Sequence, residues 1–301
     1  MRAVRYHEYG TADVLRLEQA PEPHAGPGQV RIVARMASVN PVDWKLRAGY
    51  MAEFMPATFP VIPGVDASGI VDEVGEGVAE VSAGAQVFGL GSATFAEYVV
   101  LDLWAVKPAA LSWEQGAAIG LASETAARIL DRLTLPERGT LLVDGAAGGV
   151  GSALVQFGVA RGYTVVATAS EPRHAYLRSL GATPTTYGEG LAKRVAALAP
   201  QGIDGAIDVA GHGSVRTLIE ITGDPTKVGA VADFGAAALG VHVADARNGR
   251  AAYALKEAAD LATRGRFSIA VAATYSLAEA GAAQALSETG HVQGKILVTI
   301  P

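Results

Sequence analysis

One segment, LLVDGAAGGVGSALVQFGVARG at residues 141–162, constrains the fold more than any other part of the chain. An apolar run typical of a buried strand leads into a glycine cluster, and a helical pattern follows directly. Ala146, Gly148 and Gly151 match the three small-residue positions of the dinucleotide-binding fingerprint, with alanine at the first. These positions permit a tight turn, a close approach to a pyrophosphate, and close packing of helix on strand. The segment therefore predicts a strand, a phosphate-binding loop and a helix.

The loop residues are candidate cofactor-binding residues, because backbone N–H groups at the N-terminus of a helix attract anions. We assign this role to Ala147, Gly148, Gly149 and Val150. A flexible turn is the alternative, since glycine-rich turns are common between strands and helices. A second apolar strand, TVVATA, completes a unit of about 30 residues and favours the phosphate-binding interpretation.

The hydrophobic pattern divides the chain into two parts. Residues 1 to 115 contain short β segments separated by glycine and proline, and a helix is expected after Ser112, a candidate N-cap. From residue 140 to 234, nearly continuous apolar strands alternate with helices. This alternation predicts a parallel sheet with helices on both faces. The segment from residue 267 to 301 is expected to form a strand, a helix and a strand, which can close that sheet or return to the first part.

We therefore predict an α/β protein with two domains. A β-rich catalytic domain spans residues 1–118 and is completed by residues 265–301. A doubly wound parallel-sheet domain of the Rossmann type spans residues 119–264 and binds the dinucleotide.

Composition narrows the class of partner. The chain has 301 residues, a net charge of −6 and no cysteine. This charge leaves no basic surplus for nucleic acid or anionic membranes, so a small-molecule substrate is expected. The longest uncharged run, residues 145–160, is too short for a membrane span, and the first residues lack the apolar core of a secretory signal. A cytoplasmic protein without disulfides or thiolate metal sites is expected.

The residues after the second strand bear on the choice between NAD and NADP. Ser170 and Arg173 can bind a ribose 2′-phosphate, with Arg173 supplying the charge. Glu171 can instead accept from a ribose 2′-hydroxyl, or can serve only as a first-turn carboxylate facing the helix dipole. Alternatively, Arg173 is an ordinary solvated helix residue with no role in binding. We predict NADPH as the cofactor.

Several segments, taken together and in order, resemble the medium-chain dehydrogenase/reductase superfamily. They are SVNPVDWKLRAGY, FPVIPGVDASGIVDEVGEGV, FAEYVV, GAAGGVG and GHVQGKILV. Within the superfamily they look most like the zinc-independent quinone oxidoreductase branch, which is related to zeta-crystallin. The resemblance implies a GroES-like first domain. Zinc-dependent members bind the metal through a cysteine and a histidine, and Asn40 and Val65 stand at those positions here, so we expect no metal site.

The resemblance implies a zinc-free, NADPH-dependent reductase of quinones or α,β-unsaturated carbonyl compounds. Hydride transfer to such a polarised acceptor needs mainly placement of the nicotinamide, followed by a proton from water or a hydroxyl. Tyr50 is the candidate acid, and packing as a rim residue is its alternative. Asn40 is expected to line the nicotinamide or acceptor site, and capping the turn before Pro41 is its alternative.

Four further residues are candidate cofactor contacts. By resemblance, Thr125 contacts the cofactor and Tyr187 lies near the adenosine 2′-phosphate, although Thr125 can also bond back to the preceding helical turn. Ala210 and Phe234 are expected to end strands at the carboxyl edge of the sheet, where ligands bind, or to be core residues. The resemblance also implies a homodimer. A protein that binds NADPH without significant turnover, as a redox sensor or structural protein, is the alternative function.

Overall fold

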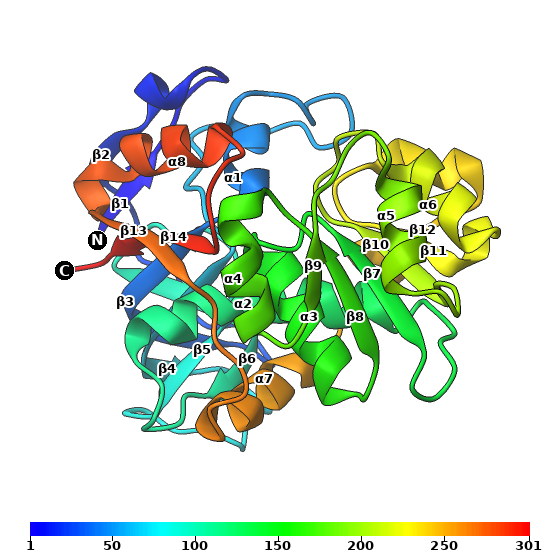
Figure 1. Ribbon diagram of the computed structural model, residues 1–301. Helices are drawn as coiled ribbons and strands as arrows, with labels where there is room; N and C mark the ends of the chain where they lie inside the picture. The colour runs from blue at the N-terminus through cyan, green and yellow to red at the C-terminus, as the bar shows by residue number, and fades with distance from the viewer. The chain divides into compact units, whose positions relative to one another are not determined.

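The computed structural model describes residues 1–301, apart from the side chain of Asn248 (Figure 1). The chain divides into two compact units, Met1–Leu121 with Leu255–Pro301, and Ala122–Ala254. Both divisions fall within helices, α2 (Trp113–Leu130) and α7 (Tyr253–Thr263). The chain thus leaves the first unit through α2 and returns to it through α7. The predicted domain boundaries lie within α2 and just after α7.

The first unit is built mainly from antiparallel strands. Its elements are β1 (Arg2–Arg5), β2 (Arg16–Gln19), β3 (Val30–Val39), α1 (Pro41–Arg47), β4 (Asp66–Val74), β5 (Gln86–Gly91), β6 (Tyr98–Val106), β13 (Val271–Ser276), α8 (Ala280–Glu288) and β14 (Lys295–Thr299). The main sheet has the order β13-β14-β3-β4-β5-β6, and β6 also pairs with β3. Strands β3 to β6 therefore form a closed sheet. Strand β6 pairs with residues 30–33 of β3, and β14 pairs with residues 36–39 of the same strand.

Alternation along β3 explains where the core of this unit lies. Val30, Ile32 and Ala34 are fully buried, whereas Arg35 between them and the strand end is exposed. The alternation ends at the register shift between Ala34 and Met36 in the pairing with β4, and all four residues after it, 36–39, are buried. The C-terminal strand β14 joins the same core and pairs with β3 in the sheet of the first unit.

The second unit is a parallel sheet with helices. Its elements are β7 (Thr140–Asp144), α3 (Gly149–Ala160), β8 (Thr164–Thr168), α4 (His174–Ser179), β9 (Thr183–Thr185), α5 (Leu191–Leu198), β10 (Gly205–Asp208), α6 (Val215–Thr222), β11 (Val228–Ala230) and β12 (His242–Val243). The order is β12-β11-β10-β7-β8-β9, with every pairing parallel. The direction of winding reverses between β7 and β10, which confirms the doubly wound α/β prediction.

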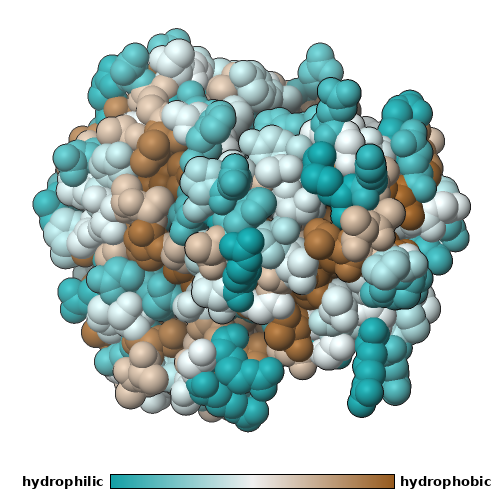
Figure 2. Space-filling model, in the orientation of Figure 1, coloured by the Kyte–Doolittle hydropathy of each residue, from teal (hydrophilic) through white to brown (hydrophobic). Residues whose placement is uncertain are grey.

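The visible surface mixes hydrophobic and hydrophilic residues. On the face shown in Figure 2, hydrophobic residues form small groups between hydrophilic ones, as is normal for a folded chain. Among the residues that the structure describes, no helix combines the length and the hydropathy needed to cross a membrane.

Candidate functional site

The loop between β7 and α3 lies at the reversal point of the second unit's sheet. Gly145 has a φ of 82°, a conformation that favours glycine, and a Cβ there would lie 2.9 Å from the Cβ of Ala210. Its N–H donates to Thr168 Oγ1 at 3.0 Å, and the Ala146 N–H donates to the Thr168 carbonyl at 2.9 Å. The glycine of the tight turn is therefore Gly145, one residue before the position that the fingerprint assigned to the turn.

The two later glycines of the fingerprint meet different surroundings. A Cβ on Gly151 would lie 2.6 Å from both Ala146 Cα and the Gly145 carbonyl oxygen, so helix and turn are in close contact there. A Cβ on Gly148, which caps α3 with a φ of −79°, would meet no atom within 4 Å. The first-turn N–H groups of Gly149 and Val150 have no acceptor within the helix. The strand, loop and helix are confirmed, and the geometry fits a bound phosphate.

Two buried carboxylates flank the reversal point, and the sequence interpretation did not select them. Asp144 ends β7 and Asp208 ends β10, in register with each other. Thr168 at the end of β8 donates to Asp144 Oδ1, while Asp208 Oδ1 accepts from the N–H groups of Ala210 and Gly211, each at 2.9 Å. Burial, and secondarily the Asp144 charge, raise the pKa of Asp208. The sequence contained a signal for both residues, because each aspartate directly follows an apolar run typical of a strand.

The residues proposed to select the cofactor follow β8, at the same sheet edge. Ser170 precedes a short 3-10 helix, Glu171–Arg173, so Glu171 lies beyond the strand and is exposed. Ala210 follows β10 on the other side of β7. The C-terminal ends of parallel neighbours share one edge, so this edge carries the α3 loop, Ser170 and Ala210 together.

Two other candidates are placed differently. Phe234 was expected to end a strand, but β11 ends at Ala230 and Phe234 begins a 3-10 helix, Phe234–Leu239. The Asp233 carboxylate caps that helix by accepting from the Ala236 N–H at 3.2 Å, which fixes the start of the helix at Phe234. Phe234 is 53% exposed, so the prediction of a strand end or core residue was wrong. Tyr187, after β9, is 58% exposed.

Thr125 lies on α2 beside a buried ion pair. Arg128 Nε donates to Glu124 Oε1 at 2.8 Å, and Glu124 Oε1 also accepts from the Ala251 N–H at 3.1 Å. The Thr125 hydroxyl lies 3.4 Å from both Glu124 Oε2 and Arg128 Nη2. This hydroxyl is therefore oriented by side-chain charges of the same helix.

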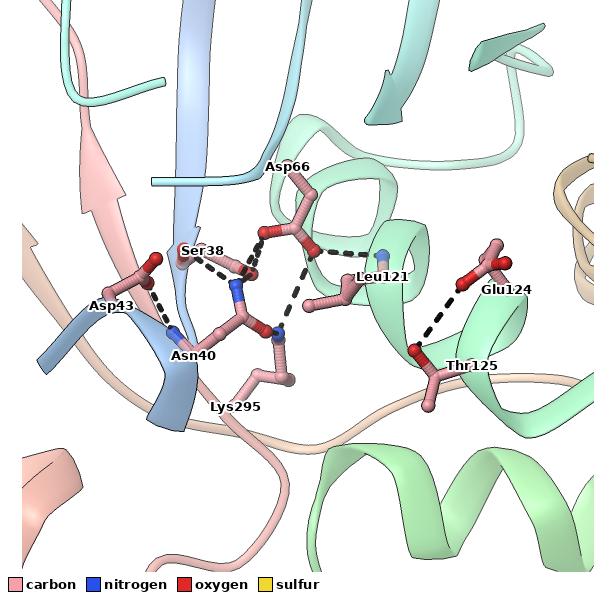
Figure 3. Close-up of polar contacts among 8 residues, drawn as sticks. All are labelled: Ser38, Asn40, Asp43, Asp66, Leu121, Glu124, Thr125 and Lys295. Carbon is pink, nitrogen blue, oxygen red and sulfur yellow. Dashed lines mark hydrogen bonds and ion pairs between the residues drawn. The ribbon is translucent and has the colours of Figure 1, made fainter. Parts of the chain in front are cut away.

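In the first unit, Asn40 lies in a buried polar cluster (Figure 3). Its Nδ2 donates to Asp66 Oδ1 at 2.8 Å and to the Ser38 carbonyl at 3.2 Å, and its Oδ1 accepts from Lys295 Nζ. Its backbone N–H donates to Asp43 Oδ2 at 2.7 Å, which fixes the start of α1. Both expected roles are therefore compatible with its position, since it begins a helix and its amide is held firmly. Sequence reasoning missed Asp66 and Lys295.

Asp43 is the most perturbed carboxyl of this cluster. It is 2% exposed, and burial raises its pKa to about 7, with the Asp66 charge adding to the rise. The Asn40 N–H and the Lys295 ammonium act in the opposite direction. Asp43 therefore gains or loses a proton near neutral pH.

Tyr50 lies apart from this cluster. It follows the C-terminal end of α1, whereas Asn40 precedes the N-terminal end, so about 10 Å of helix separates the two. The side chain is 73% exposed, and its ring packs edge-on against Trp44 with centroids 5.8 Å apart. Tyr50 has the exposure of the expected rim residue, and its catalytic role stays a prediction.

Family models match both parts of the chain. A model described as the alcohol dehydrogenase GroES-like domain matches residues 26–110, and one described as zinc-binding dehydrogenase matches residues 149–242. The chain has no cysteine, so it has no thiolate ligand for zinc. In addition, the described residues contain no group of three or more His, Asp or Glu arranged to hold a metal ion.

Named relatives extend these matches. The chain is 37% identical over 203 residues to 2-methylene-furan-3-one reductase of Solanum lycopersicum, covering 60% of this chain and 50% of that protein. It is 36% identical over 198 residues to the NADPH-dependent alkenal/one oxidoreductase of Arabidopsis chloroplasts, covering 60% and 51%. The alignments thus span about half the length of these relatives. A quinone oxidoreductase structure from Coxiella burnetii superposes with a TM-score of 0.85 at 28% identity, covering 100% of this chain and 99% of that one.

Proposed function

Because the chain belongs to the medium-chain dehydrogenase/reductase superfamily, we propose that it is an NADPH-dependent reductase of quinones or α,β-unsaturated carbonyl compounds. The observation that carries this proposal is the α3 loop, which leaves open space at Gly148 at the reversal point of a doubly wound sheet. Relatives named as an NADPH-dependent alkenal/one oxidoreductase and a quinone oxidoreductase support the acceptor class.

The second unit would hold NADPH, which when bound supplies a hydride from its nicotinamide. The backbone of Ala147, Gly148, Gly149 and Val150 would bind the pyrophosphate, where a side chain at Gly148 would intrude. Ser170 and Arg173 would bind the 2′-phosphate, with Tyr187 nearby. Ala210 would contact the cofactor from the next strand end, and Thr125 would contact it from α2.

The first unit would orient the acceptor and supply the proton that it takes up. Asn40 and Val65 stand where zinc-dependent members have ligands, so no Lewis acid polarises the acceptor in this proposal. The acceptor must then be polarised already, as quinones and enones are. Asn40 would orient the nicotinamide or acceptor, and the exposed hydroxyl of Tyr50 or water would deliver the proton.

Parallel titrations with NADPH and NADH, followed by absorbance decay with 1,4-benzoquinone or a small enone, test the proposal. Tight NADPH binding and acceptor-dependent oxidation are expected. Gly148→Leu should fold and lose at least about tenfold in NADPH affinity, because its side chain would occupy the phosphate space. Binding without oxidation across a varied acceptor panel would favour the redox sensor or structural protein, and preference for NADH would make Glu171 the ribose contact.

Two further parts of the proposal concern assembly and location. We propose a homodimer formed through β12, which is an edge strand of its sheet and pairs on one side only with β11. Light scattering that gives a monomer mass at micromolar concentration would contradict it. We also propose a cytoplasmic location, in keeping with a chain that has no cysteine to oxidise, and fractionation of cells tests this.

A further inference from the structure

Three segments that are distant in the sequence meet in a buried cluster of the first unit. Asn40 precedes α1, Asp66 begins β4 and Lys295 begins β14. These residues are 4%, 0% and 6% exposed, respectively. We call them the Lys–Asn–Asp cluster. An ammonium and a carboxylate buried this deeply are costly to desolvate, so each needs partners that compensate for the lost water.

The contacts within the cluster use every polar atom of the Asn40 side chain (Figure 3). Lys295 Nζ donates to Asn40 Oδ1 and lies 3.7 Å from Asp66 Oδ2. Asn40 Nδ2 donates to Asp66 Oδ1 at 2.8 Å. Asp66 is itself fixed, because Oδ1 accepts from Ser38 Oγ at 2.6 Å and Oδ2 accepts from the Leu121 N–H at 2.9 Å.

The Lys295 and Asp66 charges, together with the Ser38 carbonyl, decide which way the Asn40 amide faces. In the observed orientation its oxygen meets the ammonium and its NH2 group meets the carboxylate. A rotation by half a turn would set the oxygen against the Asp66 carboxylate and the NH2 group against the Lys295 ammonium. Both contacts would be repulsive, and the atoms cannot find water because the site is buried. Lys295 and Asp66 thus lock one rotamer of Asn40.

Lys295 is the only member of the cluster that can supply positive charge. The buried Asp43 carboxyl lies close enough for its pKa to respond to both Asp66 and Lys295. Without Lys295, Asp66 would be a buried anion beside a second acidic group, and the Asn40 oxygen would lose its donor. The expected result is a freer amide rather than an altered backbone, because Asn40 keeps its backbone bond to Asp43.

We propose that Lys295 is a positioning residue for Asn40, holding the amide in the orientation that places the nicotinamide or acceptor for hydride transfer. This inference rests on the proposed function, in which Asn40 lines that site. Lys295 itself need not touch the acceptor or the cofactor. The role predicts an effect on turnover that passes through Asn40 and leaves cofactor affinity unchanged.

A double-mutant cycle tests the inference, with Lys295→Met, Asn40→Ala and the combined variant measured in the full chain. Lys295→Met should lower kcat by about 10- to 100-fold, because small misplacements of reacting groups have effects of that size. NADPH affinity should change by less than about threefold. In the Asn40→Ala background the same substitution should lower kcat by no more than about twofold, since its target is already absent.

The chain offers a matched control and a conservative variant. Lys107 is also buried, but its Nζ donates to the carbonyls of Leu111, at 2.6 Å, and Pro108, at 3.3 Å. Lys107→Met should lower stability and leave kcat within about twofold of wild type. Lys295→Arg keeps the charge and should recover most of the lost turnover. If Lys295→Met does not fold, Lys295→Gln, which removes the charge, enters the cycle in its place, and its expected loss of kcat is smaller because it keeps a donor for the Asn40 oxygen.

The outcomes separate the inference from the proposed function. Equal losses from Lys295→Met with and without Asn40 would show an independent structural role and overturn the inference, as would an unchanged kcat. A wild-type chain that binds no NADPH, or reduces no quinone or enone, would overturn the proposed function and the inference with it. An active wild type whose cycle shows strong coupling supports both.

Discussion

The α3 loop and the Lys–Asn–Asp cluster are built in opposite ways. The loop and the first turn of α3 together use seven consecutive residues, 145–151, and would bind a phosphate through backbone groups where side chains are small or absent. The cluster uses charged and amide side chains from segments around residues 40, 66 and 295. A local backbone site depends on free space at each position, whereas a cluster of distant side chains depends on balanced buried charge. Substitutions should therefore affect the two regions by different physical routes.

The largest effect is expected where the charge balance of the cluster is broken. Asp66→Leu leaves the buried Lys295 ammonium without its carboxylate and removes the acceptor of Ser38 and the Leu121 N–H. The free energy of unfolding should fall by about 3–5 kcal/mol in urea titrations. Asp72→Leu on the same strand removes a partly exposed pair with Arg31 and should lower it by at most about 1 kcal/mol. Similar losses of unfolding free energy in Asp66→Leu and Asp72→Leu would contradict the claim that the cluster depends on balanced buried charge.

The pH dependence of stability should identify Asp43. Its folded pKa, about 7, exceeds its ordinary value of 3.8, so the folded chain holds the proton more tightly. The contribution of Asp43 to stability is complete below about pH 4 and is lost as the pH rises through about 7, by at most about 4 kcal/mol. Urea unfolding at several pH values should show this decline in wild type and its absence in Asp43→Asn. Parallel curves for the two chains would contradict the assignment.

The glycines of the loop should separate packing from binding. Gly151→Ala places a Cβ 2.6 Å from backbone atoms and should lower the free energy of unfolding by about 2–3 kcal/mol. Gly148→Leu meets open space and should lower it by about 1 kcal/mol, through the loss of a good N-cap residue. Thermal and urea unfolding measure both. If Gly148→Leu were the more destabilising, the space at Gly148 would not be open.

The smallest effect is expected at Arg173, a side chain that would supplement the backbone groups of the cofactor site. Arg173→Ala should raise the Kd for NADPH about tenfold and leave that for NADH within about twofold, because only NADPH carries the 2′-phosphate. Arg178→Ala, on α4 nearby in the sequence and exposed, should change neither Kd. Fluorescence titration measures both. Equal losses for the two cofactors would indicate a structural role for Arg173.

The sequence was most informative where neighbours along the chain make the structure. The strand, loop and helix at residues 140–160 and the helix beginning after Ser112 follow from local patterns, and Ser112 Oγ indeed accepts from the Gln115 N–H at 3.2 Å. The tight-turn glycine was displaced by one residue, because Gly145 has the positive φ and Ala210, which follows β10, leaves no room for a side chain there. Phe234 was misplaced because the Asp233 cap ends the extended chain.

By itself, the sequence determined the two-part α/β architecture, the dinucleotide fingerprint and the lack of thiolate ligands. These depend on periodicity, on small residues at fixed spacing and on composition, and all three are properties of a linear chain. Only the tertiary structure decided that Asn40 meets Asp66 and Lys295, that Asp144 lies in register with Asp208, and that Thr168 holds the turn. Pairing of strands brings these side chains together, and the energy of a buried charge depends on neighbours that no local pattern specifies.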